Sequence, residues 1–87
     1  MTVATEVSER LRNEAEEAQH VARLLLEKLR MIESERAAGK LGNHDPAQEV
    51  AAEHGYTLSY VMHVLWGMES DADVVQLGGE FRLPGAE

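Results

Sequence analysis

Apolar residues between positions 5 and 38 recur at alternating spacings of four and three, which is the pattern of an amphipathic helix with a heptad seam. No Gly or Pro interrupts this segment, and the good helix formers Ala, Glu, Leu and Arg dominate it. Thr5 is the expected N-cap and Gly39 the expected exit. The seam positions are Leu11, Ala15, Ala18, Ala22, Leu25, Leu29 and Ile32. The pattern predicts one helix of about 34 residues.

A helix of that length would span about 50 Å, which is more than the rest of the chain can cover. The N-terminal part of the seam is rich in Ala and therefore suits close pairing with a second helix. We predict a homodimer through Leu11, Ala15, Ala18, Ala22 and Leu25, with parallel and antiparallel pairing both open. In the alternative interpretation the whole stripe packs on its own domain.

Two shorter helices are predicted after the Asn43-His44-Asp45-Pro46 segment. Asp45 is a favourable N-cap for a helix that ends near His54, and Gly55 permits a tight turn. Thr57 then caps a third helix over residues 58–68. The inward stripe of this third helix is expected to be Leu58, Val61, Val64, Leu65 and Met68.

The segment DVVQLGGEFRLPG contains two short apolar runs around a Gly-Gly pair, which predicts a β-hairpin. With a three-residue loop Leu77 pairs with Phe81 and one face is fully apolar, whereas a two-residue loop pairs Leu77 with Glu80. The apolar face favours the three-residue loop.

The stretch QEVAAEHGYTLSYVMHVL resembles the helix-turn-helix superfamily. Ala51 corresponds to the small residue between the two helices, Gly55 to the turn glycine, and Val61 and Val64 to inward residues of the second helix. Together with the hairpin, the order of elements resembles the winged-helix family. An ordinary helical hairpin is the alternative interpretation.

The expected fold is therefore mainly α with a small β-hairpin. Residues 1–40 form a long helix for dimerisation that also supplies the first helix of the domain, and residues 41–87 form the helix-turn-helix and its wing. The resemblance implies that the second helix of the motif lies in the DNA major groove and the wing lies on the phosphate backbone.

The charge distribution conflicts with DNA binding. The chain carries a net charge of −8, and residues 41–87 hold eight acidic residues against one basic residue, Arg82 on the wing. Affinity for phosphate backbones comes mainly from Lys and Arg, which an acidic surface lacks.

The outward face of the third helix is expected to carry Ser59, Tyr60, Met62, His63 and Trp66. None of these is an Arg, Lys, Asn or Gln that reads a base with two hydrogen bonds. Exposed Met and aromatic side chains are instead typical of protein interfaces. Trp66 also has a second interpretation, in which it is buried against the wing.

No other chemistry is indicated. The chain contains no Cys, and His44, His54 and His63 show no recognised metal-ligand spacing with Glu49 and Glu53. We expect no enzyme activity, no cofactor, no bound metal and no membrane partner, and a cytoplasmic location.

Two functions follow from these patterns. The first is an acidic winged-helix regulator that acts through protein-protein contacts, as an adaptor or inhibitor of a nucleic-acid-associated machine. The alternative is a dimeric, sequence-specific DNA-binding transcriptional regulator. Its cations would be Arg23, Lys28, Arg30, Arg36, Lys40 and Arg82.

Overall fold

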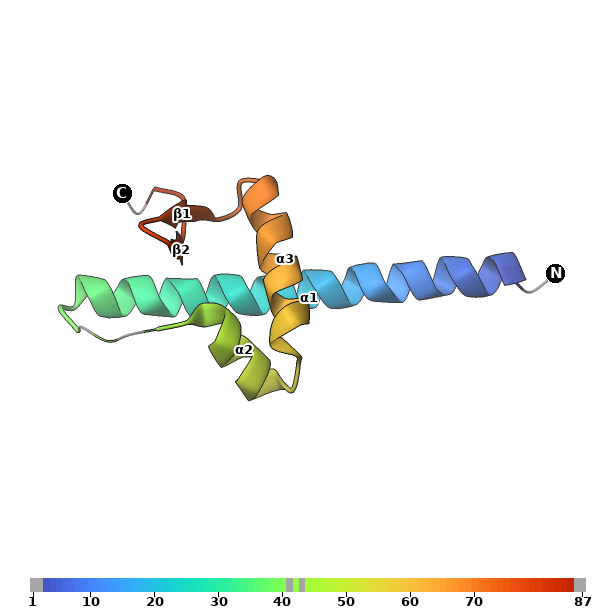
Figure 1. Cartoon of the computed structure of the whole chain (residues 1–87), viewed down its shortest axis with the longest axis horizontal. Helices are drawn as coiled ribbons and strands as arrows, with labels where there is room; N and C mark the ends of the chain where they lie inside the picture. Colours follow the sequence, from blue (N-terminus) through green and yellow to red (C-terminus); the bar gives the residue numbers. More distant parts are fainter. Residues whose placement is uncertain (1–2, 41, 43, 86–87) are drawn as a thin grey trace.

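The protein is mainly helical, with a small two-stranded antiparallel hairpin at its C-terminal end (Figure 1). The computed structural model describes the backbone of residues 3–40, 42 and 44–85, and the side chains of these residues from Glu14 onward. The elements in chain order are α1 (Val3–Ala37), α2 (Pro46–His54), α3 (Leu58–Ser70), β1 (Val75–Leu77) and β2 (Glu80–Arg82). The predicted order of three helices and two strands is present.

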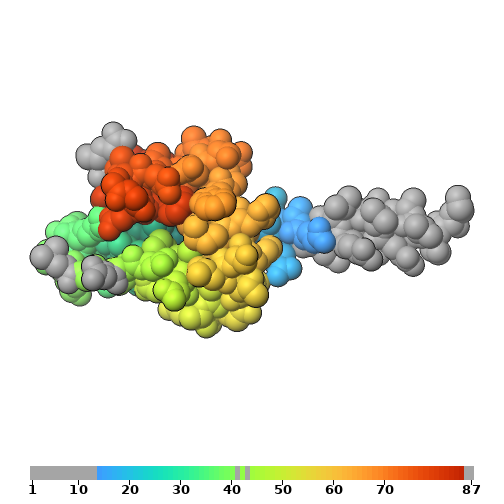
Figure 2. Space-filling model, viewed as in Figure 1, coloured from blue at the N-terminus to red at the C-terminus, as the bar shows by residue number. Residues whose placement is uncertain are grey.

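The long helix α1 forms the axis of the molecule, which measures 59 × 25 × 18 Å. The elements α2, α3 and the hairpin lie against its C-terminal half, while the N-terminal half projects beyond α3 (Figure 1). Figure 2 shows residues 14–20 emerging from the side of the globular part. The rest of the chain thus covers only part of α1.

The helix ends follow local capping rules, with one exception. Helix α1 begins at Val3, so Thr5 lies inside its first turn and the predicted cap is wrong, because no helix breaker precedes Thr5. At the other end Gly39 adopts the left-handed conformation with φ 79°. The amide of Lys40 donates to the carbonyl of Glu35 at 2.9 Å, which completes a Schellman motif.

The predicted caps of α2 and α3 are both present. The Asp45 carboxylate accepts a hydrogen bond from the amide of Gln48 at 3.2 Å, and the Thr57 hydroxyl accepts one from the amide of Tyr60 at 3.2 Å. Gly55 ends α2 in the left-handed conformation with φ 74°. Asp45 thus fixes the start of α2, and Gly55 and Thr57 form the tight turn between α2 and α3.

Each helix contributes one apolar stripe to a shared core. Leu58 departs from the predicted stripe: it is 45% exposed, because it begins α3 one turn before Val61 and lines an open groove instead of the core. The buried residues are Val21, Leu25, Leu29 and Ile32 of α1, Ala47, Val50 and Ala51 of α2, Val61, Val64, Leu65 and Met68 of α3, and Val74.

The hairpin has a two-residue loop, so the predicted three-residue loop is wrong. Leu77 lies opposite Glu80, and Val75 lies opposite Arg82. The loop residues 78–79 have φ values of 60° and 84°, which are the two positive values that a tight type I′ turn requires and that glycine adopts without strain. The preference of the Gly-Gly pair for this turn therefore outweighs the pairing of Leu77 with Phe81.

Candidate functional site

The outward face of α3 presents a large aromatic side chain to solvent. Because Val61, Val64 and Leu65 are buried on the inner face, the helical repeat places Trp66 on the opposite side, where it is 58% exposed. The interpretation in which Trp66 is buried against the wing is therefore wrong.

Trp66 lines an open groove along the first two and a half turns of α3. All five residues predicted for the outward face line this groove, which we call the Trp66 groove: Ser59, Tyr60, Met62, His63 and Trp66, together with Thr57 and Leu58. Ser59 and His63 are exposed, whereas Tyr60 and Met62 are half-buried and pack against the core. Sequence reasoning missed Leu58, although its place directly after the cap residue put it at the exposed end of the stripe.

Tyr60 is a half-buried residue of the groove that packs against the core and against a second aromatic ring. Its ring lies against Tyr56, with centroids 5.8 Å apart and an angle of 37° between the planes. Burial, and then the nearby carboxylate of Glu17 on α1, raise the pKa of the Tyr60 phenol above its ordinary value. The phenol therefore stays neutral at physiological pH. The exposed members of the groove are Thr57, Leu58, Ser59, His63 and Trp66.

Arg82 lies on β2, but its guanidinium is directed back toward α1. Its Nε and Nη2 donate to the two carboxylate oxygens of Glu33 at 2.5 Å and 3.0 Å. The two side chains are only 19% and 23% exposed. The expectation that Arg82 contacts a DNA phosphate is thus at odds with this pair, which joins the hairpin to the long helix.

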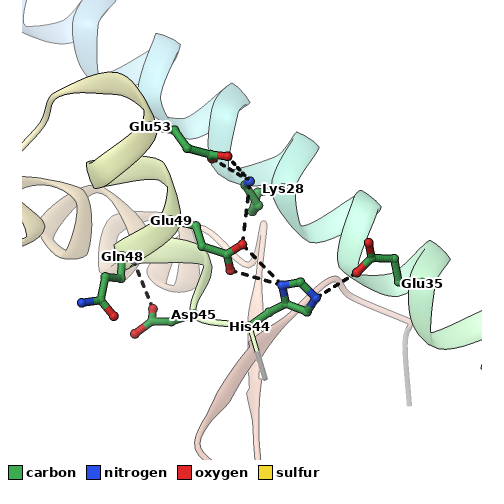
Figure 3. Close-up of polar contacts among 7 residues, drawn as sticks. All are labelled: Lys28, Glu35, His44, Asp45, Gln48, Glu49 and Glu53. Carbon is green, nitrogen blue, oxygen red and sulfur yellow. Dashed lines mark hydrogen bonds and ion pairs between the residues drawn. The ribbon is translucent and has the colours of Figure 1, made fainter. Parts of the chain in front are cut away.

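Two further cations, both on α1, form ion pairs with other elements. Arg36 donates to Glu80 of β2 at 3.0 Å. Lys28 lies 2.6 Å from a carboxylate oxygen of Glu53 on α2 (Figure 3). The sequence predicted none of these partners, because 25 to 49 positions separate the members of each pair.

His44 bridges α1 and α2 just before the cap of α2. Its Nε2 lies 2.8 Å from Glu35, and its Nδ1 lies 3.3 Å from Glu49 (Figure 3). Within the described part of the chain, no group of three or more His, Cys, Asp or Glu side chains is placed to hold a metal ion. The contacts of His44 attach the connecting segment to both helices.

The predicted dimer seam is divided by the fold. The side chain of Leu11 lies outside the described residues, Ala15 is exposed, and Ala18 and Ala22 are half-buried against the core. Leu25 is completely buried because α2 and α3 pack on this part of α1. Its assignment to the dimer seam is therefore wrong, and any pairing surface ends at Ala22.

The Glu33–Arg82 pair predicts a pH-dependent contribution to stability. The hydrogen bond from Arg82 holds the pKa of Glu33 below its ordinary value of 4.5, so the pair stabilises the fold above about pH 4.5. This stabilisation is lost as the pH falls through the lowered pKa of the folded state. We expect Glu33→Gln to lower the melting temperature by a few degrees at pH 7.

Thermal unfolding from pH 7 to pH 3 measures this effect. The difference between the wild type and Glu33→Gln should narrow below pH 4.5, because the wild type then loses the same interaction. Glu27→Gln, an exposed position on the same helix, is the matched control and should show no such narrowing. A difference that stays constant over the whole range would contradict the assignment.

Comparisons of this chain with known protein families, curated proteins and solved structures found no match. Among the described residues, no helix is long and apolar enough to cross a membrane. The candidate site is therefore defined by its own chemistry: an exposed indole, an exposed Leu side chain and two polar groups on one face of a capped helix.

Proposed function

We propose that this chain is a non-enzymatic regulatory protein of the winged-helix type that acts through protein-protein contacts, as an adaptor or inhibitor of a nucleic-acid-associated machine. The single observation that carries the proposal is the exposure of Trp66 on the outward face of α3. Trp is among the residues that most often dominate the binding energy of protein interfaces.

The winged-helix part of the proposal rests on four positions and on the order of the elements. Ala51, Val61 and Val64 are buried between the helices, as the resemblance implies. Gly55 occupies the turn in the left-handed conformation. A hairpin follows α3 and is joined by ion pairs to the end of α1, which is consistent with a wing.

The chemistry of the Trp66 groove favours a protein partner. Leu58 and Trp66 provide an apolar centre, and Ser59 and His63 provide hydrogen-bonding groups beside it. None of the described residues that line this groove is a Lys or Arg. The complementary partner has an apolar pocket for the indole and basic groups around it, since the chain carries a net charge of −8.

The ion pairs count against the alternative function, a dimeric DNA-binding regulator. Of the six cations that this alternative requires, Lys28, Arg36 and Arg82 are paired with carboxylates of the same domain. Phosphate contacts by these residues would break pairs that join α1 to α2 and to the hairpin. The exposed cations Arg23, Arg30 and Lys40 all belong to α1 or the turn that follows it, and not to α3.

A DNA titration separates the two functions. We expect no saturable binding to mixed-sequence duplex DNA by fluorescence anisotropy at about 150 mM salt, because the chain is acidic and three of its described cations are already paired with carboxylates. Binding at lower salt should be weak and should show a shallow salt dependence. A protein with a known steep salt dependence serves as the positive control.

Saturable DNA binding would support the alternative function. Saturable binding by a dimer with a steep salt slope would make DNA-binding regulation the function of this chain. Absence of binding directs the next experiment to proteins: capture from host extract with the wild type and with Trp66→Ala, followed by affinity measurement with each purified candidate.

A further inference from the structure

The Trp66 groove is an uncharged surface on a chain with a net charge of −8. None of the described residues that line it is an Asp, Glu, Lys or Arg. Two further cavities adjoin the groove, because one of them shares Met62 with it and the other shares His63. The charges that surround the groove therefore decide which kind of partner is attracted to it.

Glu69 lies directly beside Trp66. The two residues are three positions apart on α3, and residues at this spacing are neighbours on a helix surface, with about 5–6 Å between their Cβ atoms. Both side chains are exposed. None of the ion pairs among the described residues involves Glu69. A cation that contacts the indole can therefore also reach this carboxylate.

Carboxylates of α1 lie near the other end of the groove, beside Tyr60. Burial is the first cause of the raised pKa of the Tyr60 phenol, the Glu17 carboxylate is the second, and Glu14 also contributes. Both glutamates are exposed, on the part of α1 that emerges from the side of the globular part (Figure 2). Exposed carboxylates thus lie close to both ends of the groove.

A third side of the groove carries two aspartates. His63 separates the groove from a cavity between α1 and α3 that Asp71 and Asp73 also line, and both aspartates are exposed. The adjoining cavity on the other side contains Arg36, which is paired with Glu80 at 3.0 Å. Among the described residues that line these two cavities, Arg36 is the only Lys or Arg. The surroundings of the groove are therefore negative.

This charge disfavours three kinds of occupant and favours a fourth. A second copy of the chain would bring like carboxylates together, and the phosphates of a nucleic acid or of an anionic membrane would be repelled. A peptide segment with cationic side chains is attracted at the same positions. Arginine suits the site better than lysine, because its planar guanidinium lies flat on an aromatic face and still donates hydrogen bonds to a carboxylate at its edge.

We propose that the Trp66 groove binds an arginine-bearing segment of the partner protein, with the guanidinium stacked on the Trp66 indole and hydrogen-bonded to the Glu69 carboxylate. This inference rests on the proposed function, since it names the chemistry of the partner at the same surface. The indole is 58% exposed, which leaves room for a guanidinium on one face beside the apolar contact proposed above.

The length of the groove sets the spacing within the segment. Leu58 and Trp66 are eight positions apart on α3, which corresponds to about 12 Å along the helix axis. An extended peptide covers this distance in about four residues. The segment therefore carries an apolar side chain for Leu58 about four positions from its arginine, in either chain direction.

A peptide series tests the arginine. The probe is a nine-residue peptide, blocked at both ends, with arginine at the centre, leucine at each end and alanine elsewhere, so that a leucine lies four positions from the arginine in either direction. Because Trp66 is the only Trp of the chain, its indole N–H resonance reports binding in an NMR titration. We expect this peptide to bind roughly 5-fold more tightly than the same peptide with lysine at its centre. Equal affinities would overturn the stacked guanidinium.

Variants of the chain test the site. Glu69→Gln should weaken binding of the arginine peptide by about 3-fold, the effect of one exposed ion pair. Glu27→Gln removes the same charge from an exposed position that does not line the groove, and this matched control should bind like the wild type. Trp66→Leu, followed by backbone amide shifts, should lose the preference for arginine over lysine. Equal losses in the two Gln variants would indicate general attraction to an acidic chain and overturn the assignment.

Failure of this inference differs from failure of the proposed function. A partner that requires Trp66, yet binds unchanged when each arginine of its contact segment is replaced by lysine, would overturn the arginine site and leave the proposed function standing. A peptide series without any preference, together with no partner that depends on Trp66, would overturn both.

Discussion

Trp66→Ala is expected to lower the affinity for the protein partner by at least roughly 30-fold, which corresponds to about 2 kcal/mol and is the effect typical of a binding hot spot. The fold should be preserved, because the indole is 58% exposed and lies outside the core. Isothermal titration calorimetry with the purified partner measures the affinity, and thermal unfolding of the same sample measures the stability.

Met31→Ala is the matched control for this experiment. Met31 is 40% exposed on α1 and does not line the Trp66 groove, so its removal tests whether any exposed apolar side chain would have the same effect. We expect Met31→Ala to bind like the wild type. Equal losses in both variants would indicate non-specific apolar adhesion. A large loss of stability in Trp66→Ala would place the indole in the core and remove the basis of the proposed function.

Leu65→Ala is expected to produce the largest loss of stability of any single change considered for this chain, about 2–5 kcal/mol. Leu65 is completely buried at the centre of α3, where it faces residues from α1 and α2. Small domains are stable by only about 5–15 kcal/mol, so this cavity removes a large fraction of the total. Urea denaturation followed by circular dichroism gives the free energy of unfolding.

Leu58→Ala provides the comparison on the same helix. It makes the same chemical change at a side chain that is 45% exposed, so we expect a loss below about 1 kcal/mol. Because Leu58 also lines the Trp66 groove, the same variant should weaken partner binding. Similar losses of stability at positions 58 and 65 would contradict the burial pattern of α3. Unchanged partner binding by Leu58→Ala would confine the contact to the Trp66 end of the groove.

The distribution of ion pairs links the fold to its electrostatics. Arg82 and Arg36 join the hairpin to α1, and Lys28 joins α2 to α1. Each of these pairs uses one of the few cations of an acidic chain. None of the residues of α3 is a Lys or Arg, and its exposed side chains include Leu58, Ser59, His63, Trp66 and Glu69. This composition is consistent with the proposed contact with a protein.

The sequence by itself determined the features that depend on neighbouring residues. The cap residues Asp45 and Thr57, the turn at Gly55 and the existence of a hairpin around residues 78–79 all follow from interactions over a few positions. Such interactions join residues only a few positions apart and can therefore be predicted from the sequence alone. The apolar spacing likewise predicted one long helix and, with the exception of Leu58, the inner stripe of α3.

Only the tertiary structure decided the features that depend on distant partners. Leu25 belongs to the seam by spacing, yet packing by α2 and α3 moves it into the core. Arg82 reaches Glu33 across 49 positions, which no local pattern encodes. The exposure of Trp66 depends on the rotation of α3 about its axis, and three-dimensional packing sets that rotation, since spacing alone allows the stripe to turn by one residue.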